Sequence, residues 1–451
     1  MSAPELRALR GAMEGISASM LGTCDLDGLP NASMISQVHW VDDEHVALSY
    51  QFFNKTRANL LATRQASVLL LDPQSLAVYR LELDHVETRS SGPLFEKMKA
   101  RLAGIASHHG LEKVFRLLGA DIFRVAGIEE VAPPSLAPSC RGISLLSAAR
   151  SCVEALARCR DFDELTEAAL DGMTRHLGIS NAMILLAEND GRLFALGSRG
   201  YAVSGVGAEI LPGEGVIGVA AREGVPIRIG HFSADYRYGA ALGAAARSAG
   251  LLAESPDGVS FPGLGTPHSQ IAVPVMAANR VLGVLFAESD EVLRFDHECE
   301  DAMVLVASQL GAMMVLLGEE ETEEAPPAAE PAAAPATTLC VRHYRRDDSV
   351  FIDHEYLIKG VAGAILWRLL REQAATGRTE FTTRELRLDR SLKLPRHAEN
   401  LDARLVLLRR RLEERGRCLR LDKTGRGRFR LVSMCGLVLE DAGEGEPAEM
   451  A

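Results

Sequence analysis

Residues 397–415 read HAENLDARLVLLRRRLEER and residues 418–432 read CLRLDKTGRGRFRLV, and these two stretches decide how the end of the chain folds. Leucines recur along one stripe of the first stretch, from Leu401 to Leu412, at the spacing of an amphipathic helix. The second stretch alternates arginine with apolar residues after the turn at 424–427, which is typical of a β-hairpin. The sequence therefore predicts an arginine-rich helix followed by a basic hairpin.

Shorter elements are predicted ahead of this helix. Residues 351–358 indicate a strand, a tight turn and a second strand, and residues 362–373 indicate an amphipathic helix. Thr382 or Thr383 carries the signal of a helix N-cap. Sheet, helix, helix, arginine-rich helix and hairpin is the order of a winged helix-turn-helix, whose last helix enters the major groove of DNA.

The charge of this segment differs in sign from that of the rest of the chain. Residues 339–435 carry 23 Lys and Arg against 13 Asp and Glu, a net charge of +10. The whole chain has 49 and 61 of these residues, so the remainder has 26 and 48, a net charge of −22. Since phosphate neutralisation supplies most sequence-independent affinity for nucleic acid, a basic segment on an acidic chain favours DNA or RNA as its partner.

Residues 339–435 resemble the effector domain of OmpR/PhoB-type transcriptional regulators. The resemblance rests on residues 401–412, similar to that family's recognition helix, and on residues 424–431, similar to its wing. It implies that this segment binds double-stranded DNA. Nothing upstream resembles the family's phosphoacceptor receiver, so phosphorylation is not the expected input. The candidate DNA-binding residues are Asn400, Arg404, Arg411, Arg426 and Arg428.

Length and composition limit the remaining architecture. The chain has 451 residues and 47% hydrophobic content, enough for about three domains with separate cores. Neither an apolar run long enough to span a membrane nor a signal-peptide pattern is evident, so we expect a soluble, cytoplasmic protein without a membrane partner. The eight cysteines are scattered without zinc-site spacing, which favours reduced thiols over disulfides or a metal site.

Two stretches mark domain boundaries. Residues 319–338 begin with acidic residues and continue with Pro and Ala, which predicts an extended linker. A weaker boundary at residues 132–138 divides the acidic body into domains at 1–131 and 143–318. The acidic, Gly-rich residues 436–451 are predicted to be a disordered tail. The expected fold class is therefore multidomain α+β.

Short strand patterns at 19–24, 31–36, 46–50 and 67–72 predict a small antiparallel barrel in the first domain. Residues 9–125 resemble the pyridoxamine 5′-phosphate oxidase-like split barrel, whose members are usually dimers that bind FMN, and sometimes haem or a deazaflavin, between subunits. Lys55 and Arg57 begin a helix whose free N–H groups are suited to a phosphate.

The resemblance implies a set of flavin-site residues. Lys55, Thr56 and Asn59 would face the phosphate, and Ser36, Ser49 and Gln51 would lie along the ring or the ribityl chain. Two alternatives stay open: a barrel kept only for dimerisation, and a haem site. The histidines considered as iron ligands are His39, His45, His108 and His109.

The middle domain, residues 143–318, resembles a GAF domain. The resemblance rests on residues 211–229, 269–275 and 280–289. GAF domains are α/β sensors that bind cyclic nucleotides, haem, tetrapyrroles, small metabolites or nothing. The irregular residues 230–268 are the expected sensing site, because a long loop in a compact domain is usually functional. The candidate residues of this site are His231, Tyr236, Arg237, Arg247 and His268. They are suited to an anionic ligand, a metal or haem, and the sequence does not identify which.

Residues 298–317 predict an almost wholly apolar helix, with Met303, Val306, Leu310 and Met313 near heptad spacing. It is either a parallel dimer helix or a core helix of the middle domain. We expect a homodimer in either case, because winged-helix regulators read paired half-sites and the split barrel shares its cofactor site between subunits.

Two functional hypotheses remain. The first is a one-component transcription regulator, in which a flavin or another ligand, as a small-molecule or redox signal, controls two winged helices. The second is an FMN-dependent oxidoreductase with regulatory GAF and basic C-terminal domains. Without a general acid/base pair or a substrate-binding signature, the enzyme is the less favoured of the two.

Overall fold

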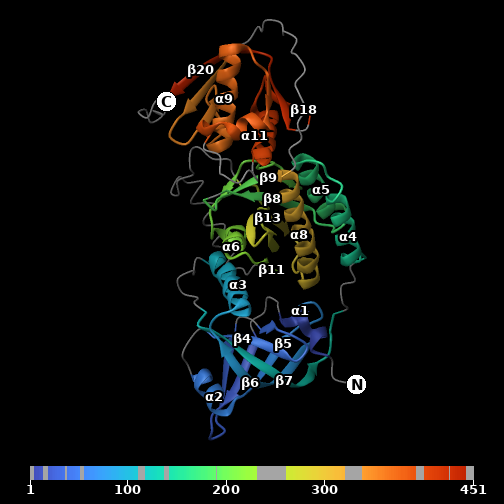
Figure 1. Ribbon diagram of the computed structural model, residues 1–451. Coiled ribbons are helices and arrows are strands. Elements are labelled where there is room, and N and C mark those ends of the chain that lie inside the picture. The colour runs from blue at the N-terminus through green and yellow to red at the C-terminus, as the bar shows by residue number, and fades with distance from the viewer. Residues whose placement is uncertain are drawn as a thin grey trace.

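The computed structural model is shown in Figure 1, with three folded parts arranged in chain order. It describes residues 5–13, 19–35, 38–50, 55–109, 117–136, 142–188, 190–230, 261–319, 338–392, 401–425 and 427–442. The predicted linker at 319–338 lies outside these residues except at its two ends.

The N-terminal domain is built on one antiparallel sheet. Its described strands follow the order β2-β1-β5-β6-β7-β4-β3, with every neighbouring pair antiparallel. Val68 and Leu70 alternate with exposed residues along β5, and both are wholly buried in one core with Phe123 of β7. The strands are β1 (Ser19–Cys24), β2 (Pro30–Ile35), β3 (Val38–Trp40), β4 (His45–Tyr50), β5 (Gln65–Leu71), β6 (Val78–Arg89) and β7 (Gly119–Ala132).

The helical segments in the described part of this domain are η1 (Leu6–Leu9), α1 (Arg10–Met13), α2 (Lys55–Thr63) and α3 (Pro93–His109). Helix α3 contacts two domains. Phe95 and Met98 pack with Ile122 of β7, whereas Ala100 packs into the core of the middle domain against α6. The domain boundary in sequence is therefore not the boundary in space, because one helix of the first domain covers part of the second.

The middle domain is a sheet between two layers of helices (Figure 1). Its order is β10-β9-β8-β13-β12-β11. Alternate residues of each strand face opposite sides: Ile184 packs with α4, α5 and α8, and its neighbours Met183 and Leu185 pack with α6 and α3. The elements are α4 (Leu145–Leu156), α5 (Phe162–Arg175), β8 (Asn181–Ala187), β9 (Leu193–Arg199), β10 (Glu209–Ile210), α6 (Gly215–Glu223), β11 (Ile227–Ile229), β12 (Ser269–Ala277), β13 (Arg280–Ser289) and α8 (His297–Glu319).

Helix α8 is the core helix of this domain. Met303, Val306 and Leu310, the residues at near-heptad spacing, are buried with β12 and α4 rather than exposed for a second chain. Among the described residues, α8 is also the one helix long and apolar enough to cross a membrane, but half of its most apolar window is buried in protein. Packing against its own sheet accounts for the buried half of that apolar surface.

The described residues of the C-terminal unit (338–392, 401–425 and 427–442) form two small sheets around three α-helices. The first follows the order β16-β15-β14-β20 and the second β17-β19-β18. Thr382 caps α10 and forms a capping box with Glu385, as the N-cap pattern predicted. The elements are β14 (Thr338–Tyr344), β15 (Ser349–Ile352), β16 (Glu355–Ile358), α9 (Gly360–Thr376), β17 (Glu380–Thr382), α10 (Thr383–Leu388), η2 (Arg390–Leu392), α11 (Leu401–Arg415), β18 (Leu419–Gly425), β19 (Arg428–Ser433) and β20 (Gly436–Ala442).

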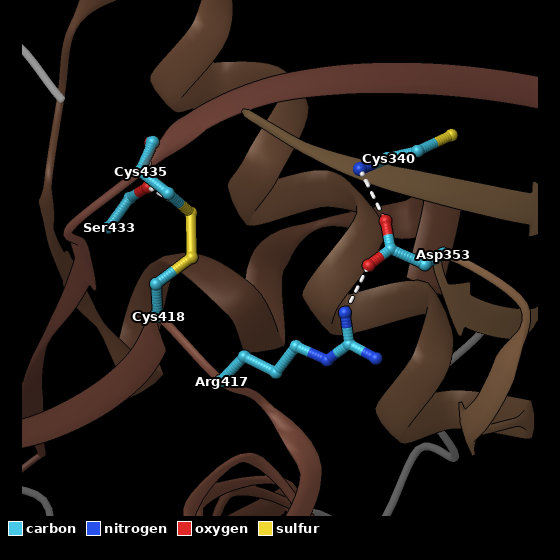
Figure 2. The surroundings of a disulfide bond; sticks show 6 residues. All are labelled: Cys340, Asp353, Arg417, Cys418, Ser433 and Cys435. Carbon is cyan, nitrogen blue, oxygen red and sulfur yellow. Dashed lines mark hydrogen bonds and ion pairs between the residues drawn. A yellow bond between two sulfur atoms is a disulfide. The ribbon is translucent and has the colours of Figure 1, made fainter. Parts of the chain in front are cut away.

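Two expectations about this unit were wrong. Residues 436–442 were predicted to be disordered, but they form β20, which pairs in parallel with β14 from Thr338 to Tyr344. All cysteines were expected to be reduced, but Cys418 and Cys435 form a disulfide (Figure 2). Non-local strand pairing explains both differences, since β20 finds its partner about a hundred residues upstream and the β18–β19 hairpin brings the two cysteines together.

Candidate functional site

Four of the predicted flavin-site residues, Lys55, Thr56, Arg57 and Asn59, lie on the first turns of α2. Lys55 is half exposed, with Nζ 4.0 Å from Asp25. Thr56 is buried: it donates to Ser33 Oγ (3.0 Å) and accepts from Asn31 Nδ2 (2.9 Å). These bonds tie Thr56 to β2 inside the N-terminal domain, so of this pair Lys55 is the one available to a ligand.

Asn59 and Arg57 face opposite sides of α2. Asn59 is buried and donates from Nδ2 to Thr23 Oγ1 on β1 (3.4 Å). Arg57 makes a bidentate ion pair with Asp121 of β7, donates to Thr88 Oγ1 (3.0 Å) and lies over the ring of Tyr50 (4.2 Å). Together with Thr56, these side chains therefore join α2 to five strands of the sheet: β1, β2, β4, β6 and β7.

Asp121 is the centre of a buried polar cluster that the sequence reasoning missed. Besides Arg57, its carboxylate accepts from Thr88 Oγ1 (2.5 Å) and lies 3.6 Å from His85 Nε2. Burial lowers the pKa of His85, while the charge of Asp121 opposes that shift. A signal was present in the sequence, because an Asp between Ala120 and Ile122 in a buried strand must have a partner.

The residues at α2 fit a phosphate group. Lys55 supplies one cation, and the first turn of α2 supplies backbone N–H groups that no helical carbonyl accepts. Arg57 adds little positive charge, because Asp121 neutralises it. Ser49 lies on β4 opposite Ala120 of β7, and Ser36 and Gln51 lie outside the described residues. If FMN binds here, Lys55 and the α2 N–H groups would hold its phosphate.

Most of the predicted sensing loop of the middle domain, residues 231–260, lies outside the described residues. His231, Tyr236, Arg237 and Arg247 lie outside the described residues. His268 is described: its backbone N–H donates to Ser289 O (2.7 Å), next to the start of β12.

Next to this loop lies a buried carboxylate that the sequence reasoning did not single out. Glu288 of β13 is 2% exposed and accepts from the backbone N–H of Leu264 (2.7 Å) and from Gln270 Nε2 (3.0 Å). Burial raises its pKa, and also that of the adjacent Tyr201. Glu288 thereby holds Leu264, near the end of the loop, against the sheet.

In the C-terminal unit, the two predicted DNA-binding arginines of α11 are both buried. Arg404 donates to Glu188 of the middle domain (2.5 Å) and lies over the ring of Phe194 (4.2 Å). Arg411 donates to Leu357 O (2.9 Å) and pairs with Glu414 (3.2 Å), both inside its own unit. Their assignment to DNA stays a prediction, and in this conformation both guanidiniums contact protein.

Two further arginines of α11 face the middle domain. Arg409 donates to both carboxylate oxygens of Asp163 (2.7 and 2.5 Å), and Arg410 donates to Glu167 (2.7 Å) and to Leu196 O (2.8 Å). The sequence shows the arginines but not these partners, which come from α5 and β9. Arg428 lies on β19 opposite Thr382, and Asn400 and Arg426 lie outside the described residues.

The chain thus consists of an antiparallel barrel-like domain, an α/β domain and a basic α+β unit. Comparison with known families gives the first two their names. Residues 6–127 match the family model described as pyridoxamine 5′-phosphate oxidase, and residues 159–315 match the GAF domain model. The chain therefore contains a pyridoxamine 5′-phosphate oxidase-like domain followed by a GAF domain.

Solved structures resemble each of these domains separately. An FMN-binding protein from Syntrophomonas wolfei is 22% identical, covering 28% of this chain and 88% of its own, with a TM-score of 0.24. The GAF domain of an Acinetobacter phosphoenolpyruvate-protein phosphotransferase is 18% identical, covering 37% and 90%, with a TM-score of 0.29. HupZ of Group A Streptococcus is 20% identical, covering 31% and 100%, with a TM-score of 0.23. No curated protein matches the chain significantly.

Proposed function

We propose that this chain is a one-component sensory transcription regulator, acting as a homodimer. In this proposal the barrel and the GAF domain detect a small-molecule or redox signal, and the C-terminal unit is a winged helix that binds double-stranded DNA. The proposal extends the two sensor-type domains to a regulatory output that neither family match contains.

The observation that carries the proposal is the arrangement of α10, α11 and the β18–β19 hairpin. A capped short helix precedes a 15-residue helix with five arginines, and a two-stranded hairpin follows directly. That order is suited to placing one helix in a major groove and a hairpin along the backbone. The net charge of +10 over residues 339–435 supplies the attraction to phosphate.

Arginines of the hairpin and of α9 provide further phosphate-binding surface. Arg420 on β18 is exposed, Arg428 on β19 is partly exposed, and Arg371 on α9 is exposed. None of the three takes part in the contacts described between α11 and the GAF domain. They are therefore the side chains through which DNA affinity can be tested without disturbing the domain interface.

The test of DNA binding uses the full chain and a fluorescein-labelled duplex of mixed sequence, titrated at several salt concentrations. Arg420→Ala and Arg428→Ala should each lower the slope of log K against log salt by about 1, because each removes one phosphate contact. Arg150→Ala, an exposed arginine of α4, is the control with the same charge change. Absence of salt-dependent binding, or equal slopes for all three variants, would contradict the proposal.

For the barrel we propose FMN as the ligand, with haem as the alternative. When bound, FMN would supply redox- or light-responsive chemistry. An absorption spectrum of the purified protein separates flavin from haem by their different visible bands. Lys55→Ala should lower the flavin content because it removes the available cation at α2, whereas Lys99→Ala, an exposed lysine of α3, should not. Equal flavin content in the two variants would remove Lys55 from the site.

The second candidate function is an FMN-dependent oxidoreductase, which the match over residues 6–127 favours. It predicts that the flavin-loaded protein consumes an electron donor through many turnovers and has no affinity for DNA. A flavin that is reduced once and then stays reduced, in a protein that binds DNA, would instead favour the regulator.

A further inference from the structure

The contacts of α11 point to a regulatory state, and this inference rests on the proposed DNA-binding function. We infer that the GAF domain is an intramolecular docking surface for α11, and that in this docked state α11 cannot enter DNA. The docking surface consists of Asp163 and Glu167 on α5, Glu188 after β8, and Phe194 and Leu196 on β9. Figure 1 shows α11 at the end of the GAF domain, next to α5 and β9.

The chemistry of arginine supports this docked state. Three arginines of α11, Arg404, Arg409 and Arg410, each pair with a different carboxylate of the GAF domain. Arginine binds a carboxylate and a phosphate through the same planar pair of N–H donors. Asp163 accepts hydrogen bonds from both terminal nitrogens of Arg409. It therefore occupies the place beside this guanidinium that a DNA phosphate would need.

Burial keeps two of these arginines away from DNA in the docked state. The side chain of Arg404 is 8% exposed and that of Arg410 is 13% exposed. A recognition helix must present its side chains to the groove, and these cannot contact a base or a phosphate while they are buried. Burial lowers the pKa of both guanidiniums, and the paired carboxylates oppose that shift.

Further contacts with the GAF domain lie on both sides of those made by α11. Lys423 of the hairpin pairs with Asp161, which also caps α5, and Lys359 before α9 pairs with Glu209 (3.1 Å). Glu414, near the end of α11, accepts from Ser204 of the GAF domain. The interface thus includes the predicted wing and the predicted recognition helix together, which are the two surfaces that DNA would use.

Docking of this kind makes DNA binding a competition between two anionic surfaces. DNA can bind only the fraction of molecules in which α11 has left the GAF domain, so the apparent affinity falls in proportion to that fraction. A ligand that moves α5 or β9 would raise the fraction without touching DNA. The sensed signal therefore acts, in this inference, by weakening the interface rather than by reshaping the DNA-binding unit.

The test compares two full-length variants with equal charge. The opening variant is Asp163→Asn, Glu167→Gln and Glu188→Gln, which removes the three carboxylates and leaves Asp161 in place to cap α5. The control variant makes three charge-neutralising changes at exposed carboxylates away from the interface, Glu87→Gln, Glu129→Gln and Glu154→Gln. Both variants lose three negative charges, so a difference between them reports the interface and not the net charge.

Two quantities are measured: affinity for the labelled mixed-sequence duplex, and hydrogen exchange of the α11 amides without DNA. We expect the opening variant to bind DNA about tenfold to hundredfold more tightly than the control variant, and its α11 amides to exchange faster. Equal affinity and equal exchange in the two variants would overturn the inference while leaving DNA binding intact. Faster exchange in α11 with no DNA binding by any form would overturn the proposed function instead.

A second opening variant keeps every charge and guards against misfolding of the triple variant. Gly197 lies under Arg410, and a Cβ added there would be 2.2 Å from Arg410 Nη1. Gly197→Ala should therefore displace this guanidinium and raise DNA affinity in the same direction as the triple variant. Unchanged DNA affinity and unchanged exchange in both opening variants would be decisive against the docked state.

Discussion

Glu300 joins the N-terminal domain to the GAF domain through two buried ion pairs, and its replacement by Gln should loosen this contact. Its carboxylate accepts from Arg101 of α3 (2.8 Å) and from Arg228 of β11 (3.0 Å). The three side chains are 5%, 7% and 8% exposed. Arg101 belongs to the N-terminal domain, whereas Arg228 and Glu300 belong to the GAF domain. Glu300→Gln removes the negative charge that both guanidiniums share.

The magnitude follows from the burial of these charges. Removing one partner of a buried ion pair costs about 3–5 kcal/mol, because the remaining charge stays in a medium that solvates it poorly. Solvent screening hardly reduces this figure, since all three side chains are less than a tenth exposed. At about 1.4 kcal/mol per factor of ten, local opening around Glu300 should become roughly a hundredfold to several thousandfold more frequent.

Hydrogen exchange of β11 and of the first turns of α8 measures this opening directly. The matched control is Glu298→Gln, on the same turn of α8 but exposed, where only the small interaction with the helix N-terminus is lost. We expect exchange at β11 and α8 to accelerate strongly in Glu300→Gln and only slightly in Glu298→Gln. Similar exchange in the two variants would refute the claim that this ion-pair cluster holds the two domains together.

The disulfide of the C-terminal unit and His85 of the N-terminal barrel are open to similar tests. Replacing the disulfide by Cys418→Ser and Cys435→Ser should destabilise the C-terminal unit by about 3 kcal/mol, because the bridge joins residues 17 apart in sequence. Urea unfolding followed by Trp367 fluorescence, in a Trp40→Phe background, measures this loss of stability. Cys340→Ser, which removes a free thiol, is the control that should not cause the same loss. In the barrel, burial lowers the pKa of His85, so the unfolded chain binds a proton at this residue more tightly than the folded chain does. The stability that neutral His85 contributes is therefore present above about pH 6.5, the ordinary pKa of histidine, and is lost as the pH falls below that value. His85→Gln should remove that part of the acid dependence of barrel unfolding, and an unchanged pH profile would show that other groups cause it.

Local patterns predicted much of the fold. The capping box at Thr382 and Glu385, the α9 helix and the β18–β19 hairpin depend on residues close in sequence, so spacing was enough to find them. Strand β20 was missed because its partner β14 lies about a hundred residues upstream, and its acidic, Gly-rich sequence resembles a disordered tail. The parallel pairing of Val438 with Cys340 has no signature in either segment alone.

The candidate sites were harder to predict for the same reason. The sequence shows that Lys55, Thr56, Arg57 and Asn59 share a helix, but their separate roles depend on which strand each one faces. The arginines of α11 were visible as a group, yet the partners of Arg404, Arg409 and Arg410 lie more than two hundred residues upstream. Long-range electrostatic pairing of this kind is set by tertiary packing, which a single sequence does not show.

The two interfaces together define a route by which the barrel could control α11. Arg101 of the barrel domain contacts Glu300 on α8, α8 packs on the same face of the GAF sheet as α5, and α5 carries Asp163 and Glu167 that hold α11. Physical adjacency alone does not establish coupling, which requires that both sites bias one two-state element. Glu300→Gln supplies the test, because Glu300 touches neither α11 nor the hairpin in any contact that the structure describes. If Glu300→Gln raises DNA affinity and accelerates α11 exchange as the opening variant does, the barrel and the docking surface share that element. If it loosens β11 and α8 while α11 exchange stays as in wild type, the GAF domain controls α11 independently of the barrel.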